Sequence, residues 1–290
     1  MKKKLIILSS LAGLAFLLVL FAVYAEENFR AIVGQDAARN IAAEPGSNAI
    51  KTVNGEIVVS PDTVVTSGTA IPVPDNAMKS DRLSPLNEQW RAVNRKDSFN
   101  EELQYYSTDN VVMNKQAITL IARNEKKADK DYTSGLIESN FNYLYGTFEF
   151  TISVPEGSGL FPAIWLMPKK DKEFPEIDIF EMIGSEPLNF YGVVHYQDQT
   201  VQKKESFCKR VQPAKTYKVV LVWTRSELSW FIDGECAYKT NKGVPDEYMY
   251  LIINHAVGGI WPGNPDEKTK FPAAFVIHNW NIQPEGKEVR

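Results

Sequence analysis

The stretch FPEIDIFEMIG, residues 174–184, places three carboxylates among large apolar side chains. Side chains alternate between the two faces of a β-strand, so Glu176 and Asp178 would share one face and Glu181 would lie on the other. A carboxylate in an apolar layer without a partner is costly in free energy. The segment is therefore either a helix or a strand whose register changes before Glu181.

Two local structures satisfy this constraint. In a short helix, Pro175 would take the first helical position and Gly184 would close the end. In a strand, one extra residue near Phe180, a β-bulge, would return Glu181 to the face of the other two acids. The sequence on either side of the stretch indicates which of these two structures forms.

Alternating apolar and polar residues recur through the second half of the chain. They run through YGTFEFTISV (145–154), YKVVLVWT (217–224), LSWFIDGECAYK (228–239) and YMYLIINHAVGG (248–259). This period is typical of half-buried strands, and Asp233-Gly234 signals a tight hairpin. Strands at short spacing without a sustained helical period predict an all-β sandwich. In that setting we expect the bulged strand, with all three acids on one face.

The amino terminus predicts export. Three lysines, residues 2–4, precede an apolar run over residues 5–25 that ends in small residues. This pattern is typical of a secretory signal, and the run is also nearly long enough to be an uncleaved membrane anchor. Residues 1–25 are therefore a signal peptide or an N-terminal membrane anchor. We expect the rest of the chain to be secreted, periplasmic or anchored facing outward.

Composition divides the remaining chain into a tether and one large domain. Residues 26–78 contain few large apolar residues and no tryptophan, which predicts a low-complexity tether. Residues 79–290 suit a single all-β domain, which we expect to be monomeric. The formal net charge of −4 offers no sign of the basic patch that a nucleic-acid-binding protein needs, so no nucleic-acid partner is expected.

The chain has two cysteines, Cys208 and Cys236. In an oxidising compartment they could form one disulfide, which typically contributes about 2–4 kcal/mol to stability. Two buried free thiols are the alternative. Neither their spacing nor nearby histidines suggest a zinc site, and the residues leave the choice between bridge and thiols open.

The three acids suit glycosidic chemistry better than metal binding. A hard cation usually takes six or more oxygens from a loop, whereas these acids alternate with Ile177, Ile179 and a phenylalanine. We therefore expect no metal ligands here. A retaining glycosidase needs two carboxyl groups about 5–5.5 Å apart, flanking the bond that is cleaved. Across a bulge, Glu176 and Glu181 could lean toward each other over Asp178.

The hexapeptide EIDIFE resembles the signature of glycoside hydrolase family 16, in the bulged form of laminarinase-like endo-β-1,3-glucanases. Further segments resemble the family's other strands, in the family's order, from about Leu83 to Ile282. They are EELQYYSTDNVVMNKQAITLIAR, YTSGLIESN, YGTFEFTISVPEGSGLFPAIWLMP, INHAVGGIWPGNPD and KFPAAFVIHNW. The resemblance implies a β-jelly roll of two antiparallel sheets with a concave sugar-binding cleft.

The resemblance also implies the roles of the acids. Glu176 is similar to the family's nucleophile and Glu181 to its acid/base, with Asp178 between them. The nucleophile must be ionised, whereas the acid must hold a proton near neutral pH. The implied activity is that of a secreted retaining endo-glycosidase, cleaving β-1,3- or mixed β-1,3/1,4-glucan by double displacement. No organic cofactor is implied, and a structural calcium, as in relatives, is an expectation without assigned ligands.

The family's substrate-binding positions fall on further residues of this chain. They are Trp165, His195, Glu149, Asn254 and Trp261. Aromatic faces stack on pyranose rings, and the polar groups would bond sugar hydroxyls or an acid. Trp223 and Trp230 are instead assigned to the core. Leu136 and Thr151 stand where family members often carry arginines that face the sugar, so the choice of β-glucan does not follow from the resemblance.

Two other classes of function use the same fold. A polysaccharide-binding module needs no general acid, so the intact acidic trio argues against it. A transglycosylase, or an enzyme that processes an exopolysaccharide, would use the same three acids. Hydrolysis and transglycosylation differ in how the site excludes water and binds the acceptor, which the sequence does not reveal.

Overall fold

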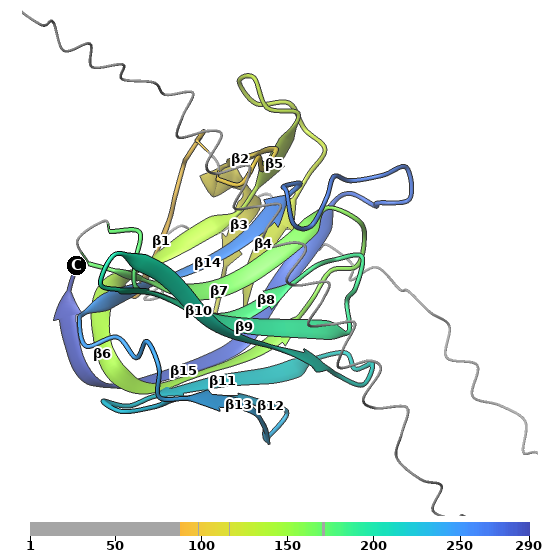
Figure 1. The fold of residues 1–290 in the computed structure, drawn as a ribbon. Coiled ribbons are helices and arrows are strands. Elements are labelled where there is room, and N and C mark those ends of the chain that lie inside the picture. Colours follow the sequence, from red (N-terminus) through yellow and green to blue (C-terminus); the bar gives the residue numbers. More distant parts are fainter. Residues whose placement is uncertain (1–87, 98, 116, 170–171) are drawn as a thin grey trace, which may run out of the picture. The chain divides into compact units, whose positions relative to one another are not determined.

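The computed structural model describes residues 88–97, 99–115, 117–169 and 172–290 (Figure 1). The expected signal or anchor (1–25), the expected tether (26–78) and the first residues of the expected domain lie outside these ranges. Within them the chain consists of β-strands and one short 3-10 helix, η3 (Thr108–Asn110). No helix in this part of the chain has the length and apolar character needed to cross a membrane.

The strands form two antiparallel layers that share one long strand, β6. We name the layers sheet I and sheet II. Sheet I has the order β10 (Val201–Arg210), β9 (Asn189–Asp198), β8 (Glu176–Met182), β7 (Leu160–Pro168), β14 (Met249–Val257), the first half of β6 (Leu136–Ser153) and β1 (Trp90–Ala92). Sheet II has the order β13 (Glu235–Thr240), β12 (Leu228–Ile232), β11 (Tyr217–Trp223), the second half of β6, β15 (Ala273–Val289), β4 (Ile118–Ala122) and β3 (Val111–Met113). A separate parallel pair joins β2 (Gln104–Tyr106) to β5 (Tyr132–Ser134).

The hydrophobic core lies between the two sheets. Phe180 of β8 stacks on Phe275 of β15, with ring centroids 5.9 Å apart. Phe190 of β9 meets Tyr217 of β11 edge to face at 4.8 Å. Every second residue of the sheet I strands therefore points into the sandwich, and the residues between them lie on the opposite, open face. The predicted all-β jelly roll of two antiparallel sheets is confirmed, and β12 and β13 form the hairpin predicted at Asp233-Gly234.

Strand β6 passes from one sheet to the other at Tyr145 and Gly146, where Figure 1 shows it curving. Before this point β6 pairs with β14, and after it with β11. Both residues have positive φ, 56° and 121°. A Cβ atom at position 146 would lie 2.3 Å from the carbonyl oxygen of Gln283. Only glycine fits this crossing, because the backbone of β15 passes directly beside it.

The cysteines do not form a disulfide. Cys208 lies on β10 of sheet I and Cys236 on β13 of sheet II, and both are free thiols. Both are also exposed, so the alternative of two buried thiols is right about the bonding state and wrong about burial. The reason is that both residues lie on edge strands of their sheets, where side chains have few neighbours.

The crossing at Gly146 can be tested against a glycine that has open space. Gly146→Ala would combine an unfavourable φ with a clash, whereas Gly234→Ala meets nothing within 4 Å and has only the unfavourable φ of 84°. Urea unfolding should show a loss of about 1–2 kcal/mol for the Gly234 variant. The Gly146 variant should lose at least about 1 kcal/mol more, because overpacking adds to the strain. Equal losses would contradict the account of the crossing.

Candidate active site

Strand β8 contains the β-bulge expected near Phe180. Opposite β8, the consecutive residues Ile164 and Trp165 of β7 pair with Phe180 and Asp178, so Ile179 is the additional residue. The register toward β9 shifts in the same place. The helical alternative is therefore wrong, since Ile177, Asp178 and Glu181 pair with strands on both sides.

The bulge brings the three acids to one face of sheet I. Glu176, Asp178 and Glu181 share the open face. The side chains of β8 that lie in the hydrophobic core are Ile177, Ile179, Phe180 and Met182. Without the bulge at Ile179, strict alternation over the same residues would turn Glu181 into this apolar core. The extra residue thus resolves the conflict between the apolar pattern and the acids.

His195 of β9 adjoins two of the acids. It is the register partner of Glu176. Its Nε2 lies 3.4 Å from Asp178 Oδ2 and 4.0 Å from Glu176 Oε1. Asp178 is only 2% exposed, and its Oδ2 makes no hydrogen bond to a protein atom in the described part of the chain. The imidazole therefore lies where it could donate a hydrogen bond to this oxygen.

Burial and mutual repulsion raise the pKa of both glutamates. The pKa of Glu176 lies well above its ordinary value because of burial, the charges of Asp178 and Glu181, and a hydrogen bond with Asp178. The pKa of Glu181 is also raised well above its ordinary value by burial and by Asp178, while Lys204 opposes the shift. For Glu181 this direction is the one that a general acid requires.

The raised pKa of Glu176 differs from the ionised nucleophile that the sequence led us to expect. The physical reason is that its carboxyl is desolvated beside two other acids, so the three groups cannot all be charged. Protons bound by such a cluster belong to the group as a whole. A proton held on Glu181 removes one of the charges that oppose ionisation of Glu176, so the two roles support each other.

Trp165 of β7 lies beside the acids as the register partner of Asp178. Its indole Nε1 donates a hydrogen bond to Asn254 Oδ1 at 2.8 Å. Asn254, on β14, donates from Nδ2 to the hydroxyl of Tyr106 at 3.0 Å. The buried amide of Asn254 is thus occupied on both ends by protein groups. The amide therefore orients the indole of Trp165, and the expected bond from Asn254 to a sugar hydroxyl stays a prediction.

A buried network of side-chain hydrogen bonds extends from this asparagine to the segment before β2. The Tyr106 hydroxyl donates to Glu102 Oε2 at 3.3 Å, and Gln104 Nε2 donates to the same oxygen at 2.7 Å. Burial raises the pKa of Glu102. Sequence reasoning missed these three supporting residues. Their alternate spacing, Glu102, Gln104 and Tyr106, was the available signal that they share one face.

Trp261 lies at the Glu181 end of the site. Its ring meets Tyr191 edge to face at 5.0 Å, and Tyr191 is the register partner of Glu181. Trp261 also contacts Phe161 at 5.4 Å. It is 40% exposed, so one side of the ring is free to contact a ligand. Tyr191 is a further residue of the site that the sequence did not single out.

The sequence around the acidic strand matches a known protein family. Residues 99–280 match the sequence profile of the family described as Glycosyl hydrolases family 16. This chain belongs to that family. It is therefore a glycoside hydrolase, and its catalytic signature lies inside the matched region.

Three similar proteins show how far the likeness extends. The "Beta-glucanase" of Rhodothermus marinus is 30% identical over 207 residues, covering 61% of this chain and 72% of that protein. The "Endo-1,3-1,4-beta-glycanase EglC" of Rhizobium meliloti is 29% identical over 212 residues, covering 63% of this chain and 45% of that protein. The crystal structure of the laminarinase catalytic domain from Thermotoga maritima has a TM-score of 0.63 at 25% identity, covering 72% of this chain and 96% of that one.

Two positions expected in the sugar site of this family 16 hydrolase lie elsewhere. Glu149 is in the second half of β6, on sheet II, where its carboxylate pairs with Lys218 at 2.9 Å. Thr151 follows on the same half of the strand. This placement contradicts the expected contact of Glu149 with substrate. The cause is the crossing of β6 between the sheets, after which its residues no longer belong to sheet I.

Leu136 does lie at the site. It pairs with Asn254 in sheet I and packs in an apolar cluster with Tyr106 and Ile252. Of the two positions where the resemblance led us to expect an arginine, only Leu136 therefore lies in sheet I, and its side chain is fully buried.

The same acids could in principle hold a cation. In the described part of the chain, Glu176, Asp178 and His195 form the one cluster whose potential ligand atoms all lie within 4.8 Å of one another. Calcium takes six to eight oxygen ligands. Three residues, one of them an imidazole, do not supply such a shell. The arrangement fits proton transfer better than metal binding.

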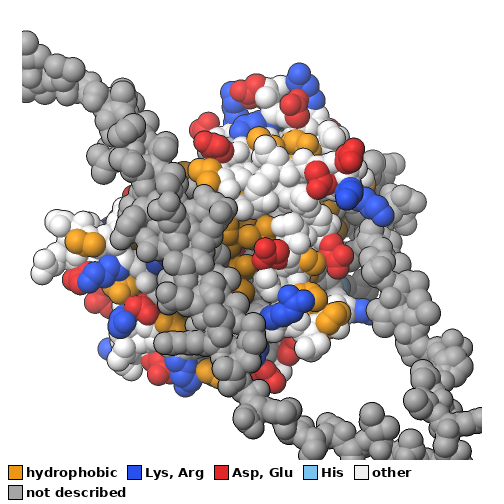
Figure 2. Space-filling model, turned by 45° about the vertical axis from the view of Figure 1, so that its right-hand side comes forward, with side chains coloured by type: hydrophobic (Ala, Val, Ile, Leu, Met, Phe, Trp, Pro, Cys, Tyr) orange, Lys and Arg blue, Asp and Glu red, His pale blue; other side chains and the backbone are white. Residues whose placement is uncertain are grey.

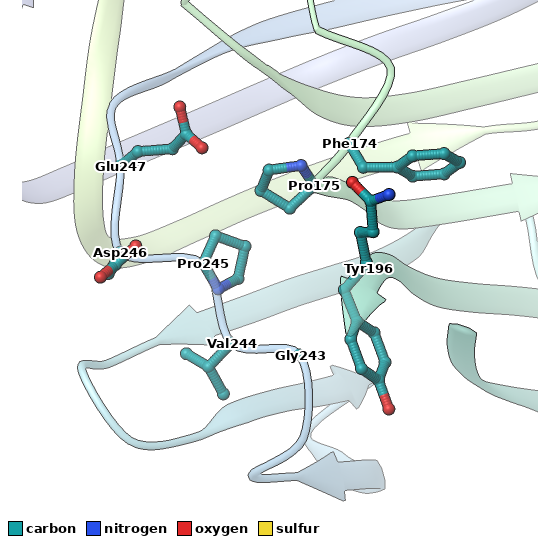
Figure 3. Close-up of a pocket in the computed structure, with 9 residues that line it drawn as sticks. Phe174, Pro175, Tyr196, Gly243, Val244, Pro245, Asp246 and Glu247 are labelled. Atoms are coloured by element: carbon teal, nitrogen blue, oxygen red, sulfur yellow. The ribbon is translucent and has the colours of Figure 1, made fainter. Parts of the chain in front are cut away.

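A hollow of about 220 Å³ adjoins the Glu176 end of β8 (Figure 3). Phe174 and Pro175, which directly precede the nucleophile candidate, form one wall, and Tyr196, Gln197 and residues 243–247 form the rest. None of the three acids lines it. The hollow therefore extends the surface beside the site and is not the reacting centre.

Replacing an acid of β8 should reduce turnover, whereas replacing an acid on sheet II should not. Glu176→Gln keeps the size of the side chain and removes its charge, so turnover of a β-glucan should fall by about 10³-fold or more. Glu149→Gln is the matched control, and it should retain wild-type turnover because Glu149 lies on sheet II. Reducing-end release measures both. Normal turnover in the Glu176 variant would refute its assignment.

The charges around Glu181 should move the pH profile in opposite directions. Asp178→Asn removes a charge that raises the pKa of Glu181, so the alkaline limb of kcat against pH should shift to lower pH. Lys204→Gln removes the cation that lowers this pKa, so the limb should shift to higher pH. Lys203→Gln, on the same strand but paired with Asp198, is the control without a shift. Shifts of the same sign for Asp178 and Lys204 would contradict the electrostatic account.

Proposed function

We propose that this chain is a retaining endo-glycosidase that cleaves a β-linked polysaccharide, with β-1,3-glucan or mixed β-1,3/1,4-glucan as its main substrate. The observation that carries the proposal is the bulge in β8, which puts Glu176 and Glu181 on one face with Asp178 between them. The linkage is inferred from similar proteins, whose names include a laminarinase and an endo-1,3-1,4-beta-glycanase.

In the first step, the carboxylate of Glu176 attacks the anomeric carbon of the sugar. The glycosidic bond breaks, and Glu181 gives its proton to the departing oxygen. The product is a covalent glycosyl-enzyme at Glu176. Loss of the proton from Glu181 is favoured at this stage, since esterification has removed the charge on Glu176 that opposed it.

In the second step, Glu181 acts as the base. It takes a proton from a water molecule, whose oxygen attacks the anomeric carbon and displaces Glu176 as a carboxylate. Two inversions leave the sugar with its original β-configuration. Both steps use side chains of this chain alone, so we infer no organic cofactor. A structural calcium stays a prediction from the family.

The substrate lies on the open face of sheet I. Trp165, held by Asn254, and Trp261, held by Tyr191, offer aromatic surfaces for pyranose rings on either side of the acids. His195 completes the face beside Asp178. Aromatic contacts spread over several strands suit binding within a long chain, and therefore internal cleavage.

The surface charge agrees with a neutral polymer as substrate. Figure 2 shows acidic and basic side chains interspersed over the described part of one face, without a continuous basic band. A nucleic-acid-binding surface would need clustered cations. We propose that the chain acts outside the cytoplasm as a monomer, either released or held by residues 5–25. This part of the proposal rests on the amino-terminal sequence alone.

The products formed from several polysaccharides test this function. The purified protein should release short oligosaccharides with new reducing ends from laminarin or lichenan, rather than from agarose or the native exopolysaccharide. Nuclear magnetic resonance of the earliest products should show the β-anomer, because a double displacement retains configuration.

Other outcomes would overturn parts of this proposal. Binding without new ends would indicate a polysaccharide-binding module, and chains longer than the substrate would indicate transglycosylation. Cleavage confined to the exopolysaccharide would contradict the glucan assignment. The α-anomer as first product would contradict the retaining mechanism.

A further inference from the structure

A tryptophan of sheet II bonds directly to the catalytic strand of sheet I. Trp230 lies on β12, and its indole Nε1 donates a hydrogen bond across the core to the backbone carbonyl of Asp178 at 3.0 Å. The side chain is 1% exposed. Its bond partner belongs to the backbone between the two catalytic glutamates. Trp230 therefore does more than fill space in the core.

The bonded carbonyl belongs to the last residue before the bulge. On the β7 side, regular pairing breaks after Asp178, where Ile179 is added. On the β9 side, the register shifts between Asp178 and Glu181. A bulge disrupts the hydrogen-bond ladder locally and leaves backbone groups in need of other partners. Here a buried N–H from the opposite sheet supplies one such partner at the point where the strand changes register.

Gly192 leaves the space that this indole needs. It lies on β9 between Tyr191 and Val193, the partners of Glu181 and Asp178, and so opposite the bulge. A Cβ atom at position 192 would lie 2.4 Å from Phe207 Cε1 and 2.9 Å from Trp230 Nε1. Any other residue here would push against the Phe207 ring and against the indole at its donor atom. The absence of a side chain at Gly192 thus leaves room for the Trp230 indole beside the bulge.

Aromatic neighbours fix the indole from the side. The ring of Phe207 on β10 lies 5.8 Å from that of Trp230, and the ring of Tyr238 on β13 lies 6.1 Å away. These contacts come from both sheets. They restrict the rotation of the indole and hold its N–H toward β8. A donor held in this way can define the position of the carbonyl that it meets.

We propose that Trp230 is a positioning residue for catalysis, whose N–H holds the bulge of β8 in the conformation that sets Glu181 against Glu176. Without this bond the extra residue can move along the strand, and a change of register by one residue turns a side chain to the other face. Trp230 touches neither sugar nor acid and acts through the backbone of Asp178. The proposal rests on the glycosidase function inferred above.

Another buried tryptophan provides a matched control. Trp223, on β11, is fully buried, and its Nε1 donates to the carbonyl of Pro245 at 3.0 Å. Trp223→Phe and Trp230→Phe therefore remove the same kind of hydrogen bond from the same core. Only Trp230 bonds to β8. A difference between the variants in catalysis, at comparable loss of stability, would report the effect on the bulge.

The test compares kcat, KM, the pH profile and the thermal melting of the two variants. For Trp230→Phe we expect kcat to fall by about 10- to 100-fold, as for a small misplacement of catalytic groups. KM should change less than about twofold, and the alkaline limb of the pH profile should move, because the surroundings of Glu181 change. Trp223→Phe should keep kcat within about twofold and an unchanged pH profile. Equal kinetic effects in the two variants would overturn the proposal.

Two further measurements keep the proposal testable. The first applies if the Trp230→Phe variant does not fold, and the second applies if no polysaccharide is cleaved. Incorporating 3-benzothienylalanine at position 230 keeps the shape of indole and removes only the donor, so it should reproduce the loss of kcat in a folded protein. Carbon-13 spectra of labelled glutamate carboxyls need no substrate. The titration of Glu181 should shift in the Trp230 variants and not in Trp223→Phe, and an unchanged titration in both would refute the proposal. An inactive wild type would refute only the glycosidase function.

Discussion

One extra residue in β8 determines which face of sheet I carries Glu181. The strand must keep Ile177 and Phe180 in the core, because these side chains fill the space between the sheets. With regular alternation, the second glutamate would then be buried among them. The bulge at Ile179 removes this conflict, and the backbone beside it is supported by an indole N–H from sheet II. The chemistry at the surface thus depends on how the core accommodates a single irregularity.

The crowding of acids on this face gives them their different roles. Desolvation and neighbouring negative charge oppose ionisation of both glutamates, so the group retains protons that separate carboxyls would lose. Lys204 on β10 brings a cationic group close to Glu181, and the imidazole of His195 on β9 lies 3.4 Å from Asp178. Proton transfer between the steps of the proposed reaction therefore needs no group beyond this surface.

The sequence predicts the fold and the acidic strand. It does not predict the features that depend on how distant parts of the chain meet in three dimensions. Alternation predicts strands and even the bulge, because a buried carboxylate is a local contradiction. It does not show that β6 crosses between the sheets at Gly146, and so Glu149 was placed at the wrong site. The partners of Asn254 come from residues far away in sequence, which no local pattern reveals. Trp230 was correctly placed in the core, but its bond to β8 exists only in three dimensions.

The most direct test of the central claim is the distance between the carboxyl groups of Glu176 and Glu181 in a high-resolution crystal structure of the protein. A bulged strand with both side chains on the open face predicts a separation of about 5–5.5 Å, as retaining glycosidases require. A separation of about 6.5–9.5 Å would indicate an inverting geometry. That result, or a regular strand that turns Glu181 into the core, would contradict the account.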